Sequence, residues 1–291
     1  MSTILRNGMF PHTLEKEIAN LTAGHSSLAK LSMSEPVPFN GKDIVTFTIN
    51  DEVALVGEGA TKPAGTAEVK SVSCVPYKVV FQMRVSDEFM TASEEEQLDI
   101  LQAFTNGFAK KLGAGLDVIA MSGKNPATGQ DSAIIGNNCF EKAVTTNTVT
   151  LGANPDEDID SACSMIEAAG YESDGLAISP AMRTALAAQK STDGTRLYPE
   201  FAFGATPAAL GSMRLDTNAT VSANSSATRA IVGDFSDAFR WGVATQGIKV
   251  IEYGDPDGQG DLQANNCVVL RGEAYLAHAI LDEKAFAVIS E

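Results

Sequence analysis

The stretch that decides how this chain folds runs from Ser93 to Gly123 and reads SEEEQLDILQAFTNGFAKKLGAGLDVIAMSG. Its apolar residues recur at spacings of three and four, which places them on one face of a helix. The pattern predicts a single long helix over 94–122, ended by the turn-forming residues after Met121. The apolar positions are Leu98, Leu101, Phe104, Phe108, Leu112, Leu116 and Ile119.

The start of this helix carries a signal of its own. Ser93 followed by Glu96 matches a capping box, and Glu94 and Glu95 suit the positive end of the helix dipole. Three consecutive glutamates could also suggest a metal site. The helix start explains them more simply, so we expect no metal there.

Two strands are predicted before the helix. Val45, Phe47 and Ile49 alternate with polar residues over 43–50, and the apolar residues of 79–85 alternate in the same way, which is typical of half-buried strands. The intervening GEGATKPAGTAEVKS has almost nothing to bury. Loops of this length are uncommon in compact domains unless they are functional or disordered. We therefore predict that 50–78 forms a long hairpin arm that projects from the body.

Residues 1–40 indicate a tether rather than a domain. A short helical patch (Leu14, Ile18, Leu21) is followed by small polar residues and a Pro-x-Pro break, which favours extended backbone. An extended arm cannot bury its own apolar residues. We expect it to lie on another surface.

Downstream of the long helix, turns alternate with shorter elements. Residues 123–153 are turn-rich, with strand candidates over 142–151, and a helix is predicted from Asp156 or Asp158 to Ala169. After a short strand, Ser179 suits the cap of another helix and Pro180 its first position. The remaining strands are predicted at 176–178, within 210–253, at Asn266–Leu270 and at Glu273–Ile280, before an apolar end at Ala285–Ile289.

Composition excludes several classes of function. Among 291 residues, 44% are hydrophobic, and 37 acidic against 21 basic residues give a net charge of −16. This is the composition of a globular protein with a sizeable core. A surface this acidic repels phosphate backbones, so direct reading of DNA or RNA is disfavoured, although such a protein could still enclose DNA.

The cysteines and histidines form no recognisable site. The four cysteines are far apart and the three histidines do not stand at metal-ligand spacing, so we expect reduced thiols, no metal and no cofactor. The first residues lack a signal-peptide pattern, and no apolar stretch approaches the ~20 residues that a bilayer crossing needs. We expect a soluble protein made in a cytoplasm, with no membrane partner.

Catalytic motifs were also sought. GEGATK lacks the spacing and ending of a phosphate loop, and no nucleophile elbow, dinucleotide fingerprint or zinc-protease motif occurs. His278 lies in an alternating run and is interpreted as a packed strand histidine. Asp234 is expected to satisfy nearby backbone groups. We predict no catalytic residue and no enzyme activity.

Four strings, taken together and in order, resemble the major capsid proteins of tailed bacteriophages. They are ISPAMRTALAAQKSTDGTRLY (Ile178–Tyr198), LGSMRL (Leu210–Leu215), RAIVGDFSDAFRWGVATQGIKVIEY (Arg229–Tyr253) and NNCVVLRGEAYLAHAILDEKAFAVI (Asn265–Ile289). Upstream, VGEGATKP, KVVFQMRVSDEFM and GLDVIAMSG agree with that family in layout. The resemblance extends from roughly residue 40 to the end of the chain.

The resemblance implies an α+β, Hong Kong 97-like capsid fold. In that fold the E-loop hairpin lies on a neighbouring subunit, and the tips of the A-domains meet around five-fold and six-fold axes. The implied parts are an N-terminal arm (1–40), the extended E-loop hairpin with its flanking strands (41–90), a P-domain with the long spine helix (91–154), an A-domain (155–250), and return strands that complete the A- and P-domains (251–291).

The same resemblance implies a structural major capsid (head) protein. Copies of the chain would self-assemble as hexamers and pentamers into the icosahedral shell of the virion, inside the bacterial host cytoplasm, and enclose double-stranded DNA without sequence-specific binding. A portal and either a separate scaffolding protein or an already trimmed chain are implied as well. The residues expected to contact neighbouring subunits are Glu58, Lys62, Glu68 and Lys70 in the hairpin, and Asp193, Arg196 and Tyr198 in the axial loop.

The predicted contact residues also have simpler explanations. The hairpin charges could merely keep an exposed arm soluble, because exposed ion pairs contribute only ~0–1 kcal/mol each. The family's type member also forms a covalent link between a lysine, an asparagine and a nearby glutamate. Asn265 falls near the matching place here, but Gly272 stands at the glutamate position and Glu273 lies on the opposite face of the strand. We expect no crosslink.

Two other functions remain open from the sequence. An encapsulin-type nanocompartment shares the fold but encloses enzymes, and a cargo-enzyme gene beside this one, instead of a portal or terminase gene, would indicate it. A cytosolic αβ enzyme is the more distant alternative. Electron microscopy separates them, since shells or hexamers indicate a capsid protein and uniform monomers an enzyme.

Overall fold

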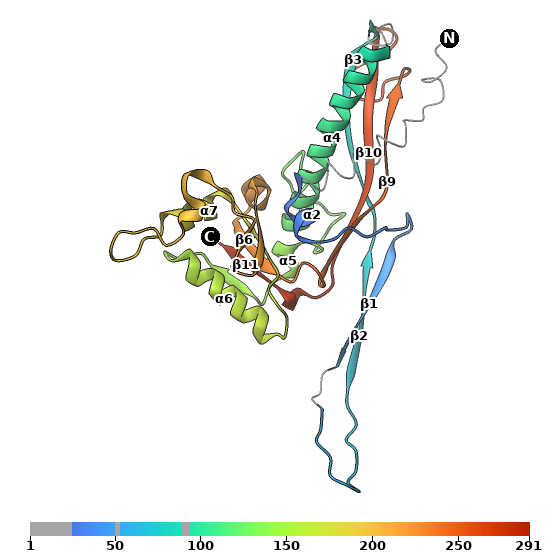
Figure 1. Cartoon of the computed structure of the whole chain (residues 1–291). Helices are drawn as coiled ribbons and strands as arrows, with labels where there is room; N and C mark the ends of the chain where they lie inside the picture. The colour runs from blue at the N-terminus through green and yellow to red at the C-terminus, as the bar shows by residue number, and fades with distance from the viewer. Residues whose placement is uncertain (1–24, 50–52, 89–93) are drawn as a thin grey trace.

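The computed structural model describes residues 25–49, 53–88 and 94–291 of the chain. These residues form a projecting hairpin, a three-stranded sheet with a long helix, and a six-stranded sheet with shorter helices (Figure 1). The helical patch expected around Ile18 and the capping residue Ser93 lie outside the described residues.

The long helix and the three-stranded sheet form an elongated unit. Helix α4 (Glu94–Ser122) has the predicted bounds and runs along a sheet of order β3-β10-β9 (Figure 1). Its strands are antiparallel: β3 (Tyr77–Ser86), β10 (Cys267–Ile280) and β9 (Phe239–Ile251).

One continuous strand, β10, replaces the two runs expected near the C-terminus. The break predicted at Arg271 and Gly272 is absent, so this prediction is wrong. Gly272 stays in the strand because it faces α4 at close range. A Cβ at this position would lie 2.8 Å from the ring of Phe108, so the glycine serves packing rather than a turn.

The second sheet has six strands in the order β4-β11-β8-β5-β7-β6. The β11–β4 and β5–β7 pairs are parallel and the other three pairs are antiparallel. The strands are β4 (Thr148–Thr150), β5 (Gly175–Ile178), β6 (Ala209–Leu210), β7 (Met213–Thr217), β8 (Thr228–Gly233) and β11 (Phe286–Ser290).

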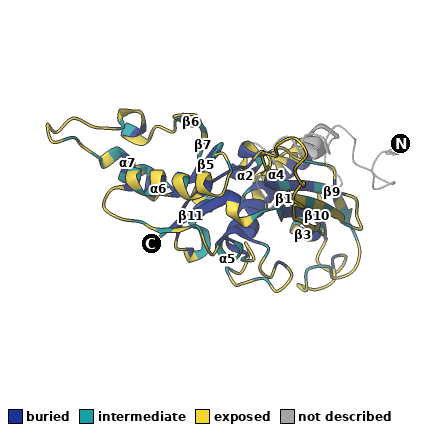
Figure 2. Ribbon diagram, turned by 90° about the horizontal axis from the view of Figure 1, so that it is seen from below, coloured by how far each residue is buried: buried dark blue, intermediate teal, exposed yellow. Residues whose placement is uncertain are grey.

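Helices α6 (Pro155–Ala168) and α7 (Pro180–Ala188) pack against one face of this sheet. Alternate residues of a central strand serve opposite faces: Ala230 and Val232 of β8 pack with these helices, whereas Ile231 points into the other core. The predicted cap of α7 is confirmed, because the Ser179 hydroxyl accepts a hydrogen bond from the Met182 amide at 3.2 Å. The central strands β5, β8 and β11 of this sheet are almost entirely buried (Figure 2).

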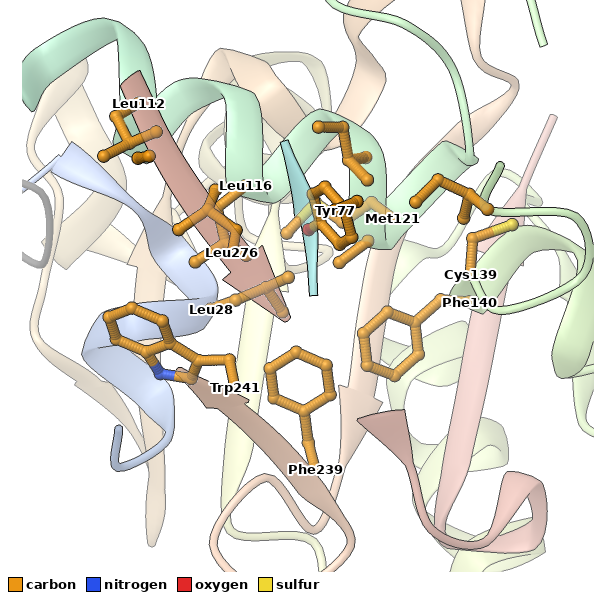
Figure 3. Packing of buried hydrophobic residues seen from close by; sticks show 14 of the residues in the cluster. Leu28, Tyr77, Leu112, Leu116, Met121, Cys139, Phe140, Phe239, Trp241 and Leu276 are labelled. Carbon is orange, nitrogen blue, oxygen red and sulfur yellow. The ribbon is translucent and has the colours of Figure 1, made fainter. Parts of the chain in front are cut away.

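The core between the two sheets is rich in aromatic rings. Phe140 belongs to the short helix α5 (Phe140–Ala143), and its ring centroid lies 4.9 Å from that of Phe286 and 5.4 Å from that of Phe239. Figure 3 shows the Phe239 ring between Phe140 and Trp241, with Leu112 and Leu116 of α4 above them. The helix α5 lies where the sequence favoured a strand start; within 142–151 only Thr148–Thr150 is extended in a sheet.

Part of the expected tether packs on the chain itself. Helix α2 (Ser27–Leu31) buries Leu28 and Leu31 in the core shared with α4 and β9, and Figure 3 shows Leu28 pointing toward Leu276. For residues 26–37 the prediction of an arm with no burial on its own body is therefore wrong. The reason is local, because the Ser26 side chain caps α2 and the helix brings Leu28 and Leu31 to one face, which packs on the core.

The hairpin consists of β1 (Lys42–Ile49) and β2 (Ala67–Cys74), paired antiparallel from Lys42↔Cys74 to Ile49↔Ala67. It extends away from both sheets (Figure 1). The predicted long arm is thus present. Its second strand, β2, was not expected, since that stretch offers few residues to bury, and β3 pairs with β10 instead of closing the hairpin.

Candidate assembly surfaces

One face of the hairpin is apolar and uncovered. Val45 and Phe47 point to this side with Val69, which is the register partner of Phe47. All three side chains are exposed, at 64%, 64% and 62% respectively. We call Val45, Phe47 and Val69 the hairpin face. The alternation predicts a half-buried strand, but Val45 and Phe47 are mostly exposed because no element of the described chain covers them.

The opposite side of the hairpin is polar along its outer part and apolar at its base. Glu68 and Lys70 lie there, 3.7 Å apart, and both are more than half exposed. Near the body, Ile44 and Val72 pack with Cys74 in a small cluster under β10. The base of the hairpin is therefore anchored, whereas its outer half carries an exposed charge pair that contributes about 0–1 kcal/mol within the chain.

The loop at the far end of the hairpin is exposed throughout its described residues. Glu58 lies within a turn in which the Ala60 amide donates to the Gly57 carbonyl at 3.1 Å, and Lys62 follows two residues after this turn. Val53 and Leu55 are fully exposed in the same loop. Two of the four predicted hairpin contacts thus lie at the tip and two on the polar side, and none lies on the hairpin face.

The predicted axial loop is a tight turn beyond α7. The Ser191 amide donates to the Thr195 carbonyl at 2.8 Å, and Gly194 after Asp193 has φ +80°, a conformation that favours glycine. Asp193 and Arg196 are exposed. Tyr198 is half-buried, and its hydroxyl donates to Asp156 of α6 at 3.3 Å. Of the three predicted contact residues, Tyr198 is thus tied to its own chain.

The structure adds an aromatic residue that the sequence analysis missed. Phe203 is 100% exposed and has φ +56°, an uncommon conformation for a bulky residue. The Arg196 guanidinium lies 5.3 Å from the centre of its ring. Strain and exposure at one residue point to a functional surface. The sequence signal was present, since Phe203 stands among small residues in FAFGATPAAL.

The buried titratable groups are structural. His278 lies between the Tyr77 hydroxyl at 3.0 Å and the Asn138 carbonyl at 2.7 Å, and burial lowers its pKa to about 4. The prediction of a packed strand histidine is confirmed. Asp234 accepts from the Asp237 amide at 2.9 Å, which confirms its predicted local role.

Features expected of other functions were compared with the described residues. Among them, no group of three His, Cys, Asp or Glu side chains is arranged to hold a metal ion. No helix in the described part of the chain is both long and apolar enough to cross a membrane. Helix α4 begins at Glu94, as the three glutamates predict. The side chains of residues 94–96 lie outside the described part of the structure.

Comparison with known proteins assigns the family. The model of the phage capsid family matches residues 7–290. The chain belongs to the phage capsid family. It is a structural major capsid protein, located in the virion capsid, and it self-assembles into a shell. A search of curated proteins finds no match.

Solved structures agree with this family. A chain from Mycobacterium phage Ogopogo is 35% identical with a TM-score of 0.78, over 91% of this chain and 92% of that one. A chain from Gordonia phage Cozz is 27% identical with a TM-score of 0.77, over 91% and 86%. The capsid of a native GTA particle shares the fold at 15% identity, with a TM-score of 0.62 over 100% and 93%.

Proposed function

We propose that this capsid protein has the Hong Kong 97-like division into parts. The three-stranded sheet with α4 would be the P-domain and its spine helix, which the sequence assigns to 91–154. The six-stranded sheet with α6 and α7 would be the A-domain, assigned to 155–250. Residues 1–40 would be the N-terminal arm, 41–90 the E-loop with its flanking strands, and 251–291 the return strands. Since β9 ends at Ile251 and pairs with β10, the chain re-enters the P-domain sheet before the proposed A-domain ends.

The hairpin would lie on a neighbouring subunit in the shell. The observation that carries this proposal is the uncovered hairpin face on a two-stranded ribbon. Such a ribbon is marginally stable alone in water and gains stability when an apolar face is covered. Burying a valine or phenylalanine side chain contributes about 1.5–3 kcal/mol. Glu58, Lys62, Glu68 and Lys70 would then pair with charges of that neighbour and set the register.

The loop beyond α7 would form the second contact, around the five-fold and six-fold axes. Asp193 and Arg196 are exposed and accessible to another copy. Phe203 adds an apolar side chain next to Arg196. Tyr198 would act less directly, by fixing the base of the loop on α6. Hexamers and pentamers built from such contacts would close an icosahedral shell, because head-to-tail contacts propagate around rings.

The remaining parts of the proposal concern partners. The shell would enclose double-stranded DNA without reading its sequence, since a net charge of −16 repels phosphates. Assembly would take place in the bacterial host cytoplasm, with a portal and a scaffolding protein as partners. We propose no enzymatic role, and no cofactor.

The experiment replaces all four hairpin charges by alanine (Glu58→Ala, Lys62→Ala, Glu68→Ala, Lys70→Ala). Urea unfolding of the unassembled chain should stay within about 1 kcal/mol of the parent, because these side chains are exposed. Shell yield, measured by sedimentation and electron microscopy, should fall. If the variant unfolds as readily as it fails to assemble, the hairpin belongs to the core of the chain and the proposal is wrong.

A further inference from the structure

Residues 26–42 form a strap that begins at a buried carboxylate of the long helix. Asp117 of α4 is completely buried. Its Oδ1 accepts hydrogen bonds from the Ser26 hydroxyl at 2.5 Å and the Leu28 amide at 3.1 Å, and its Oδ2 accepts from the Ser27 amide at 2.8 Å. One side chain of α4 thus holds three consecutive residues of the strap.

The Asp117 carboxylate also binds a residue of the segment that follows strand β7 of the six-stranded sheet. Thr220, in the short helix η2 (Ala219–Ser225) that follows β7, donates to Oδ2 of Asp117 at 2.7 Å. Asp216 of β7 accepts from the Ser27 hydroxyl at 2.5 Å and from Lys30 at 2.7 Å. The start of the strap therefore ties α4 to the six-stranded sheet.

The other end of the strap is fixed at the base of the hairpin. The Glu35 amide donates to the Trp241 carbonyl at 2.8 Å. The Glu35 carboxylate lies 2.9 Å from Arg240 of β9 and 3.0 Å from Lys42, the first residue of β1. The strap passes so close to β9 that a Cβ on Gly242 would lie 2.0 Å from the Glu35 carbonyl oxygen.

We propose that this strap sets the direction in which the hairpin leaves the body, and that Asp117 is the group that keeps it seated. Release at Asp117 would expose Leu28 and Leu31 and leave the hairpin base held by Glu35 and by the small cluster of Ile44, Val72 and Cys74. The joint between α4 and the six-stranded sheet would loosen in the same event. The consequence for assembly rests on the proposed role of the hairpin, but the strap itself is a property of the single chain.

The seating of the strap should depend on pH. Burial raises the pKa of Asp117 to about 6, although the hydrogen bonds from Ser26, Ser27, Leu28 and Thr220 act in the opposite direction. Once the strap is released, the solvated Asp117 of α4 would titrate near the ordinary aspartate pKa of about 3.9. The seated form then binds the proton more tightly, so falling pH favours it. Between pH 7.5 and 5 the seating equilibrium should shift by about tenfold.

The surroundings of Asp117 suit a neutral carboxyl as well as an ionised one. Two of its four donors are hydroxyl groups, on Ser26 and Thr220, and a hydroxyl can turn to accept the carboxyl proton. The charged side chains on the packed elements are Lys30 of α2 and Asp216 of β7, which pair with each other, and Arg214 of β7, which pairs with Asp174. The residues of η2 carry no titratable group, and the exposed His25 takes part through its carbonyl oxygen, which accepts from Asn218 at 3.4 Å.

Hydrogen exchange of the full-length, unassembled chain tests the strap. Asp117→Asn keeps one oxygen acceptor but turns an NH2 group toward a strap amide, and amides from 27 to 49 should exchange at least tenfold faster. Ser26→Ala serves as the second variant if Asp117→Asn fails to fold. It removes one hydrogen-bond donor to Asp117, and the exchange rate of the same amides should increase by a smaller factor, three- to tenfold. Ser122→Ala is the matched control, because this buried hydroxyl donates to the Val118 carbonyl of its own helix at 2.8 Å. It should leave strap exchange within twofold of the parent.

Three results would overturn the proposal. Exchange could rise at 27–37 but stay unchanged at 42–49, which would mean that the strap does not reach the hairpin. The exchange rate of the strap amides could rise as much in Ser122→Ala as in Asp117→Asn, which would mean that the effect is not specific to the contact between Asp117 and the strap. Protection of the strap, corrected for intrinsic exchange, could fall rather than rise from pH 7.5 to 5. Because no assembly takes part in this measurement, each outcome is independent of whether the hairpin binds a neighbour.

Discussion

Strand β8 of the six-stranded sheet and strand β1 of the hairpin both contain several β-branched residues, but their surroundings are opposite. In β8, Ile231 points into one core and Val232 into the other, and both are fully buried. In β1, Val45 and Phe47 share one face and are mostly exposed. Side-chain alternation gives a strand its two faces, but the layers packed on those faces decide whether it is stable by itself. Both faces of the six-stranded sheet are covered by other parts of the same chain, whereas the apolar face of the hairpin is not covered by any described part of the chain.

Phe140→Ala should have the largest effect on the stability of the single chain. The ring is completely buried and packs against three other phenylalanines, so its removal leaves a cavity between the two sheets. We expect a loss of about 3–5 kcal/mol in the free energy of unfolding, measured by urea titration.

Phe203→Ala is the control for that change. The same chemical deletion at a fully exposed ring should alter the unfolding free energy by less than about 0.5 kcal/mol. A loss of several kcal/mol in Phe203→Ala, or none in Phe140→Ala, would contradict the contrast between core and projecting surfaces.

Two buried groups in the body should give opposing pH effects of intermediate size. The pKa of His278 is lowered by burial to about 4, so the unfolded chain takes up the proton first and stability falls as pH drops below about 6.5. The pKa of Asp117 is raised by burial to about 6, so the folded chain takes up the proton first and stability rises over the same range. Between pH 6.5 and 5 each effect should amount to about 1–2 kcal/mol, and in the parent chain they largely cancel.

Substitutions separate the two contributions. His278→Asn should leave a chain whose unfolding free energy rises as pH falls from 6.5 to 5, and Asp117→Asn one whose unfolding free energy falls. The slope against pH is the relevant quantity, since both variants are also destabilised at every pH by lost hydrogen bonds. Equal slopes in the two variants would rule out this assignment of the titrating groups.

The sequence was most informative where a local pattern determines the structure. The apolar stripe of α4 and the Ser179–Pro180 start of α7 could be predicted because spacing and capping are properties of neighbouring residues. The uncovered hairpin face could not, because alternation in β1 reports two faces and says nothing about what covers them. Asp117 was also missed. It stands inside the apolar run GLDVIAM, and only the fold brings Ser26 and Thr220 to it.

Phe47→Ser should have the smallest effect on the single chain and a large one on assembly. Because the ring is 64% exposed, the unfolding free energy should change by less than about 0.5 kcal/mol. In a shell the same ring would be covered, and its loss at every subunit contact, at about 1.5–3 kcal/mol each, would be multiplied over the assembly. Thr46→Ser, on the other side of the same strand, is the matched control and should assemble normally. Normal shell yield from Phe47→Ser, or destabilisation as large as that of Phe140→Ala, would mean that the hairpin face is not covered by a second copy of the chain.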